Sequence, residues 1–202
     1  MRKDIMDSTN KLFGLILSGG RSTRMGNDKG LISYHGLPQR EYLYQLAANF
    51  CEDTFLSIRA EQEKEIGAEF NFIIDKNEYK GPLNGIISAH KEHPEVSWLV
   101  LACDLPLLNH QSIKILIEQR DPEKVATTYA TSESSLPEPL VAIWEPQGLQ
   151  NAIKYMEIAG SSCPRKFLIN SDVKLVFPNN DEVLYNANSI LEYEFAKSKV
   201  DK

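Results

Sequence analysis

Short apolar runs alternate with longer amphipathic stretches along the chain, and this alternation limits the possible folds most strongly. Residues 11–17 (KLFGLIL) and 97–104 (SWLVLACD) are almost continuously apolar, which is typical of strands buried on both faces. Strand-length runs that alternate with helix-length stretches are typical of α/β proteins. The sequence therefore predicts a single-domain α/β fold with a mainly parallel sheet and helices on both of its faces.

The same alternation gives a set of expected elements. Strands are expected at residues 11–17, 53–59, 70–75, 97–104, 125–129, 137–144 and 174–177, and helices at 38–47, 61–66, 111–118, 147–158 and 189–196, with a loop that enters a helix at 81–90. The two prolines of the strand at 137–144 restrict it to a sheet edge, or else they occupy its first residues. No repeat or linker divides the chain, so we expect a flexible N-terminus at residues 1–10 and one domain at 11–202.

Composition narrows the class of ligand. The 202 residues include 28 acidic and 22 basic side chains, for a net charge of −6. This balance argues against nucleic-acid and anionic-membrane partners, which require a basic surface. No apolar run approaches the roughly 18 residues that span a bilayer, and the three cysteines are odd in number and far apart, as reduced thiols are. We expect a cytoplasmic protein that holds any phosphate ligand at a local site.

A glycine-rich segment, LSGGRSTRMGNDKG, follows the first expected strand at residues 17–30. Open α/β sheets bind ligands at this position, beyond the carboxyl ends of their strands. Gly19, Gly20 and Gly26 would let backbone N–H groups approach an anion closely. Arg24 and Lys29 add a planar guanidinium and a compact ammonium that suit phosphate oxygens. The segment therefore predicts a polyphosphate site, with a flexible surface turn as the alternative.

The spacing of this segment excludes two other phosphate-binding loops. A P-loop ends in Gly-Lys-Ser or Gly-Lys-Thr, whereas Gly26 is followed by Asn27 and Asp28. A dinucleotide-binding loop needs G-x-G-x-x-G, which does not occur here, and this argues against a dehydrogenase.

A carboxylate, Asp104, follows the most clearly apolar strand. Mg²⁺ prefers one or two carboxylates together with phosphate oxygens, so Asp104 is a candidate metal ligand near the glycine-rich segment. The alternative is a turn residue, because aspartate before Leu-Pro is a common choice at a strand end.

Residues 17–29 match every specified position of L-x-G-G-x-S-x-R-M-G-x-D-K, the first motif of the MobA family of molybdenum cofactor guanylyltransferases, which the chain resembles. The resemblance continues in Asp75 with GPLNG (81–85), in CDLP (103–106), in EPLVAIW (138–144) and in RKFL (165–168). The closing N-x-N-T-P signature appears as NANSILEY (186–193), in which Ser189 and Ile190 replace the Thr-Pro pair.

This resemblance implies a Rossmann-like nucleotidyltransferase fold, with a nucleotide-binding half at about 11–110 and an acceptor-binding half at about 111–200. It implies an enzyme that transfers GMP from GTP to the phosphate of molybdopterin, with Mg²⁺ as cofactor and pyrophosphate as the leaving group. Its partners would be GTP, molybdopterin, and molybdoenzymes or other proteins of cofactor biosynthesis.

The resemblance also implies roles for individual residues. The catalytic residues would be Arg24, Lys29 and Asp104, with Asp104 as the metal ligand. The nucleotide-binding residues would be Leu17, Ser18, Gly19, Gly20, Lys29, Ser57, Asp75, Gly81, Gly85 and Asp104. The acceptor-binding residues would be Arg165, Lys166, Asn186 and Asn188. For Asp75, the alternative to nucleotide binding is a structural role as a helix or turn cap. For the basic pair Arg165 and Lys166, the alternative to acceptor binding is a place at the solvent-exposed start of a helix.

Two other functions remain open at this point. One keeps the chemistry with different substrates, either CTP with molybdopterin or another nucleoside triphosphate with a sugar or alditol phosphate. The other is a nucleotide-binding module without turnover. The combination of Arg24, Lys29 and Asp104 favours turnover, because a protein that only binds nucleotide has less need of a metal carboxylate.

Overall fold

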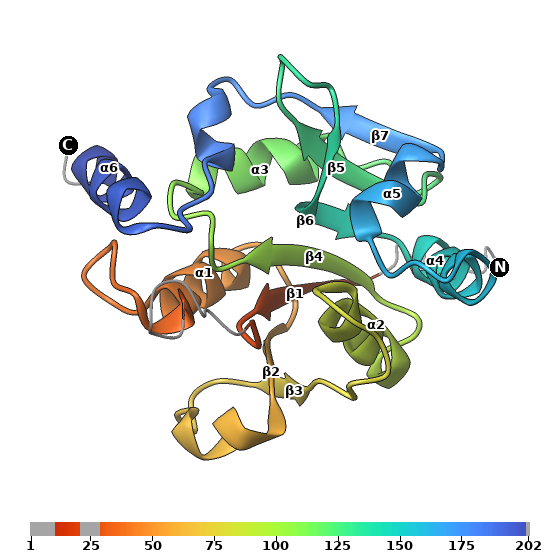
Figure 1. Ribbon diagram of the computed structural model, residues 1–202, viewed down its shortest axis with the longest axis horizontal. Helices are drawn as coiled ribbons and strands as arrows, with labels where there is room; N and C mark the ends of the chain where they lie inside the picture. The colour runs from red at the N-terminus through yellow and green to blue at the C-terminus, as the bar shows by residue number, and fades with distance from the viewer. Residues whose placement is uncertain (1–10, 21–28, 201–202) are drawn as a thin grey trace, which may run out of the picture.

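A computed structural model describes residues 11–20 and 29–200, so the predicted residues Arg24 and Gly26 lie outside the described residues. The described strands form one seven-stranded sheet in the order β3-β2-β1-β4-β6-β5-β7 (Figure 1). They are β1 (Leu12–Leu17), β2 (Thr54–Ile58), β3 (Phe72–Ile74), β4 (Ser97–Ala102), β5 (Ala126–Ala130), β6 (Pro137–Trp144) and β7 (Val173–Val176). Only β6, among these, is antiparallel to its neighbours, which confirms the mainly parallel sheet.

Helices cover both faces of the sheet, as expected (Figure 1). The α-helices are α1 (Gln39–Ala48), α2 (Leu83–Glu92), α3 (His110–Glu118), α4 (Pro146–Ala159), α5 (Pro164–Ile169) and α6 (Ile190–Val200), and the 3-10 helices are η1 (Lys29–Leu31), η2 (Ala60–Glu65) and η3 (Asp181–Leu184). Apolar side chains of α2, α4 and α5 pack in the core on one face, and those of α1 and α3 pack in the core on the other. The sheet is therefore buried on both sides, which explains its continuously apolar strands.

Helix α6 packs away from the sheet. Tyr34, Ala187 and Ala196 form a small apolar cluster of their own, and Lys197 Nζ donates a hydrogen bond to the carbonyl of Tyr34 at 2.9 Å. The C-terminal segment is thereby held against the chain that follows η1. None of the described helices is both long enough and apolar enough to span a membrane.

Strand β6 lies inside the sheet, between β4 and β5, so the expectation of an edge strand is wrong and the alternative placement of its prolines is correct. Its pairing with β4 begins at Val141, opposite Leu101, beyond both Pro137 and Pro139. The missing N–H groups of the prolines therefore cost no hydrogen bond to β4. Because β6 is antiparallel, its first residues lie at the same sheet edge as the carboxyl ends of β1 and β4.

The basic segment at 165–168 lies in the short helix α5. From the sequence alone, a helix start at this position is only the alternative to acceptor binding. Pro164 occupies its first turn, where a missing N–H costs nothing. Phe167 and Leu168 are buried in the core, and Gly160 ends the preceding helix α4 in the left-handed conformation, with φ of 60°. These contacts position α5 beside the start of β6.

Candidate active site

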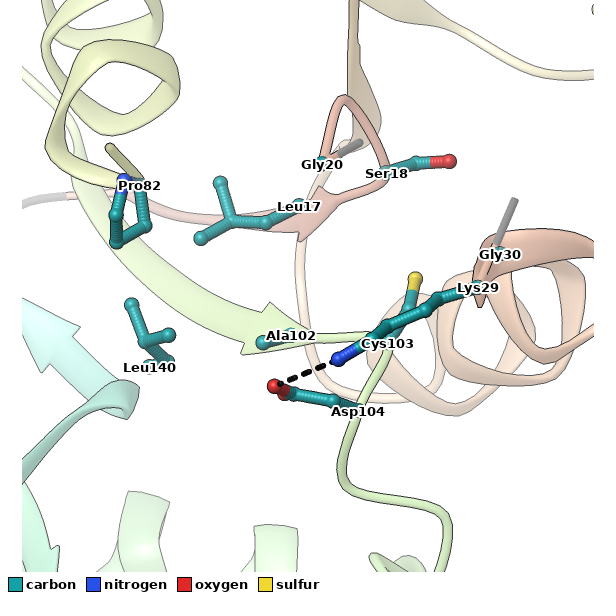
Figure 2. Close-up of a pocket in the computed structure, with 10 residues that line it drawn as sticks. All are labelled: Leu17, Ser18, Gly20, Lys29, Gly30, Pro82, Ala102, Cys103, Asp104 and Leu140. Atoms are coloured by element: carbon teal, nitrogen blue, oxygen red, sulfur yellow. Dashed lines mark ion pairs between the residues drawn. The ribbon is translucent and has the colours of Figure 1, made fainter. Parts of the chain in front are cut away.

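Three adjoining cavities lie at the edge where β1, β2 and β4 end and β6 begins. The Asp75 cavity, of about 110 Å³, is lined by Leu17, Gly19, Gly20, Ser57, Asp75, Gly81, Pro82 and Gly85. The Asp104 cavity, of about 120 Å³, is lined by the residues drawn in Figure 2. The Arg165 cleft, of about 630 Å³, is lined by residues 80–82, 138–140 and 160–165. Pro82 lines all three, so the cavities share walls.

Lys29 and Asp104 face each other in the Asp104 cavity. Figure 2 shows the Lys29 side chain reaching toward Asp104, and its Nζ lies 3.6 Å from Asp104 Oδ2. Lys29 Nζ also donates a hydrogen bond to Asn188 Oδ1, and the Ala187 N–H donates to the Asp104 carbonyl at 2.9 Å. The end of β4, the start of η1 and the segment before α6 therefore converge on one point, although they are far apart in the sequence.

The other carboxylate oxygen of Asp104, Oδ1, is buried and has no hydrogen-bond partner in the described chain. A buried polar atom without a partner is costly, and a bound cation would remove that cost. The described residues contain no group of three or more His, Cys, Asp or Glu side chains that could enclose a metal. A single carboxylate fits Mg²⁺ that takes its remaining ligands from phosphate and water.

Asp75 and Ser57 form the polar floor of the Asp75 cavity. The Ser57 hydroxyl donates to Asp75 Oδ1 at 2.6 Å, and the Asp75 N–H donates to the Ile58 carbonyl at 2.8 Å, which positions the residue beyond the end of β3. Burial raises the pKa of the Asp75 carboxyl, although the Ser57 hydrogen bond and the nearby Arg59 oppose that shift. The carboxylate therefore faces the cavity in a partly desolvated environment.

Two glycines make room for this floor. A Cβ atom at Gly19 would lie 2.8 Å from Asp75 Oδ2, and a Cβ atom at Gly85 would lie 2.3 Å from Ser57 Oγ. Real Cβ atoms do not approach oxygen atoms this closely. Any larger residue at either position would displace the Asp75–Ser57 pair.

Two residues outside the predicted set of site residues hold the start of the glycine-rich segment. Arg59 Nη1 donates to the Gly19 carbonyl at 2.5 Å, and Gln62 Nε2 donates to the Ser18 carbonyl at 3.3 Å. Gln62 Oε1 in turn accepts the Arg59 N–H at 2.9 Å. Gln62 is buried within the otherwise charged stretch AEQEKE, and that contrast is the only signal in the sequence that could have pointed to it.

The predicted acceptor-binding residues do not all come together. Arg165 lines the Arg165 cleft, and Asn188 contacts Lys29 beside the Asp104 cavity. Lys166 and Asn186 are exposed and belong to the lining of none of the three cavities. The side-chain amide of Asn186 donates instead to the Leu184 carbonyl at 3.5 Å.

An ion pair lies at one wall of the Arg165 cleft. Arg165 Nη2 contacts Glu138 Oε2 at 2.5 Å, and Arg165 Nε donates to the Pro137 carbonyl at 3.2 Å. Burial raises the pKa of the Glu138 carboxyl, and the Arg165 charge opposes that shift. Glu138 is the second residue of β6, so the antiparallel direction of this strand is what brings its carboxylate to the cleft.

Comparisons with known proteins agree on a family. Residues 14–174 match the model of the MobA-like NTP transferase domain. The chain is 40% identical over 187 residues to the molybdenum cofactor biosynthesis bifunctional protein of Synechocystis, covering 92% of this chain but only 54% of that protein. It is 31% identical over 185 residues to the molybdenum cofactor guanylyltransferase of Pseudomonas fluorescens, covering 87% of this chain and 88% of that protein.

A solved structure shows the same fold. The molybdopterin-guanine dinucleotide biosynthesis protein A of Archaeoglobus fulgidus superposes with a TM-score of 0.76 at 20% identity, over 94% of this chain and 98% of that chain. The family match covers most of the chain, from β1 to β7, and includes all three cavities. The chain belongs to the MobA-like NTP transferase family.

Proposed function

We propose that this protein transfers GMP from GTP to the phosphate of molybdopterin and releases pyrophosphate, with Mg²⁺ as its cofactor. The observation that carries the proposal is that three adjoining cavities place a half-buried carboxylate, a lysine–carboxylate pair and a wide cleft side by side. These three cavities can take the base, the phosphates and the acceptor of a nucleotidyl transfer. The relatives named molybdenum cofactor guanylyltransferase support the choice of substrates.

In this proposal Asp75 recognises guanine. Guanine presents an N1–H donor and an exocyclic amino group on one edge, and an ionised carboxylate can accept from both. Adenine has an unprotonated N1 on that edge, so the half-buried carboxylate would lose a partner. A site built on hydrogen bonds rejects an analogue that leaves them unmade far more strongly than an apolar pocket does.

The phosphates of GTP would lie in the Asp104 cavity. Lys29 neutralises charge on the departing pyrophosphate, and the backbone N–H groups of Gly19 and Gly20 donate to phosphate oxygens. Arg24 is assigned the same charge-neutralising role. Asp104 would hold Mg²⁺, which when bound supplies Lewis-acid stabilisation of charge on the phosphate oxygens.

Molybdopterin would enter through the Arg165 cleft, which shares Pro82 and Leu140 with the Asp104 cavity. An oxygen of its phosphate then attacks the α-phosphorus of GTP. One P–O bond forms as the bond to pyrophosphate breaks. We assign Arg165 and Asn188 to positioning of the acceptor, with Lys166 and Asn186 as further predicted contacts. The division of the chain into two halves near residue 110 is part of the same proposal.

The test is an assay of the purified protein with Mg²⁺, molybdopterin and each of the four nucleoside triphosphates, with pyrophosphate and the dinucleotide product as readouts. We expect GTP to be preferred strongly and Asp75→Ala to flatten the preference. Asp53→Ala is a matched control, because Asp53 is an exposed carboxylate at the opposite end of β2. A wild-type preference for CTP would contradict the GTP assignment. A GTP preference that survives Asp75→Ala would keep the reaction but remove Asp75 from base recognition.

A further inference from the structure

Three charged side chains line the Arg165 cleft, namely Lys80, Glu138 and Arg165. Glu138 and Arg165 form an ion pair, so their charges largely offset each other. Lys80 makes neither a hydrogen bond nor an ion pair with its side chain in the described part of the chain. The net charge of the cleft lining is therefore positive, and it comes from Lys80.

The backbone on both sides of Lys80 is well defined by hydrogen bonds. The Tyr79 N–H donates to Asn84 Oδ1 at 3.2 Å, and the Asn84 N–H donates to the Gly81 carbonyl at 3.2 Å. Gly81, with φ of 73°, makes the turn into α2 in a conformation that side chains other than glycine rarely adopt. Lys80 is thus fixed at the rim where the Arg165 cleft meets the other two cavities, both of which Pro82 lines.

The acceptor phosphate of the proposed reaction must come close to carboxylates. Its attacking oxygen has to reach the Asp104 cavity, and it passes Glu138, whose carboxylate interacts electrostatically with that of Asp104. Arg165 alone cannot compensate an added dianion, because Glu138 already offsets its charge. Lys166 does not line the cleft. Within the cleft lining, Lys80 is the cation whose charge no carboxylate among the described residues offsets.

We propose that Lys80 binds the phosphate of the acceptor and supplies the net positive charge for it, while Arg165, oriented by Glu138, offers directed N–H donors. This inference rests on the proposed function, since it concerns the acceptor of the same reaction. Lys80 belongs to the connection between β3 and α2, in the nucleotide-binding half, so one acceptor contact would come from each half of the chain.

The experiment measures equilibrium binding of molybdopterin and of GTP separately by titration calorimetry, and then the KM for each in the transfer assay. Lys80 is exposed, so screening limits the expected effect. We expect Lys80→Ala to weaken molybdopterin binding by about three- to tenfold and Lys80→Glu by about ten- to thirtyfold, with GTP binding changed less than about twofold. Lys80→Arg should restore most of the affinity. Lys76→Ala is the matched control, because Lys76 is an exposed lysine of the same connection that lines none of the cavities.

The outcomes separate this inference from the proposed function. If the wild-type protein binds both ligands but transfers no GMP, the proposed function is wrong, and the molybdopterin titration still decides the role of Lys80. If the wild-type protein transfers GMP and Lys80→Glu binds molybdopterin as tightly as the wild type does, Lys80 is not an acceptor-binding residue. Equal weakening of GTP and molybdopterin binding by Lys80→Glu would also overturn the assignment, because it would indicate a general charge effect.

Discussion

The two sides of the cleft are built differently. The Asp75 and Asp104 cavities are narrow, and their walls are strand ends whose positions are set by backbone hydrogen bonds and by close contacts at Gly19 and Gly85. The Arg165 cleft is several times larger, and its charged lining is an ion pair and Lys80, whose side chain has no hydrogen-bond or ion-pair partner among the described residues. Close steric contacts therefore distinguish the nucleotide side, where charged groups also act, whereas the wider acceptor side relies mainly on charged side chains. Substitutions on the two sides should differ in size and in the substrate that they affect.

The largest effect is expected for Asp104→Asn, at the point where the two sides meet. Loss of the carboxylate charge leaves the phosphates uncompensated and removes the expected Mg²⁺ ligand. That should cost several kcal/mol of transition-state stabilisation, or about a hundredfold or more in kcat. The measurement is steady-state transfer across a series of Mg²⁺ concentrations, with circular dichroism to verify the fold. Near-normal turnover at low millimolar Mg²⁺ would contradict the role of Asp104.

Lys29→Ala and Arg165→Ala compare the two sides directly. A charge-assisted contact to phosphate is worth about 1.5–3 kcal/mol, or roughly ten- to hundredfold. We expect Lys29→Ala to raise the KM for GTP and lower kcat, and Arg165→Ala to raise the KM for molybdopterin. Kinetic titration of each substrate at saturation of the other gives both values. If Arg165→Ala raised the KM for GTP alone, the two sides would be wrongly assigned.

Gly85→Ala tests the steric character of the nucleotide side. The new Cβ atom would lie 2.3 Å from Ser57 Oγ, so the Asp75–Ser57 pair must shift and GTP binding should weaken by about tenfold. In a Ser57→Ala background the 2.3 Å contact is absent and contacts of 3.2 Å with Asp75 Oδ1 and Leu17 Cδ2 remain, so the same substitution should cost less. A double-mutant cycle on GTP binding measures this coupling. Additive effects of the two substitutions would show that the predicted contact does not matter.

The smallest expected effect is a change with pH in the preference for GTP over ATP. Burial raises the pKa of Asp75, so its carboxyl becomes protonated at a higher pH than an exposed aspartate does. A protonated carboxyl cannot accept both guanine donors, and the preference for GTP over ATP should fall several-fold as the pH is lowered toward that raised pKa. The ratio of the two kcat/KM values across pH is the readout, and in Asp75→Asn this ratio should not change with pH. An unchanged ratio in the wild type would contradict the role of an ionised Asp75.

The raised pKa of Asp75 also makes the stability of the fold depend on pH. Because the pKa of Asp75 is raised in the folded state, its contribution favours folding below the unfolded-state pKa, and that contribution is lost as the pH rises through the folded-state value. Asp75→Asn should therefore raise the midpoint of thermal unfolding at neutral pH and change it less under acidic conditions. Thermal unfolding of both proteins at the two pH values checks the sign.

The nucleotide side could largely be predicted from the sequence. Its strands are short apolar runs, and Lys29, Asp75 and Asp104 follow strands that end at one sheet edge. Parallel strands bring such ends together, so local patterns were sufficient to gather these residues. Gln62 was missed because one uncharged residue in the charged stretch AEQEKE is a weak signal, and its burial is visible only in the structure.

The acceptor side could not be predicted in the same way. The direction and interior position of β6 depend on pairing with β4 and β5, which no local pattern reveals, and its prolines suggested an edge. Without that direction, neither the Glu138–Arg165 pair nor the position of Lys80 beside it can be derived. Lys166 looked equivalent to Arg165 in the sequence, but the short helix α5 leaves it outside the cleft lining.

The most direct test of the central claim follows the phosphorus atoms of GTP. GTP labelled at the α-phosphate, and separately at the γ-phosphate, is incubated with the protein, Mg²⁺ and molybdopterin. Transfer of GMP across the cleft predicts that the α label appears in the molybdopterin product and the γ label in pyrophosphate, both in equal amounts and both lost in Asp104→Asn. Release of the γ label as orthophosphate, with no α label in the acceptor, would show that the protein hydrolyses GTP and would contradict the claim.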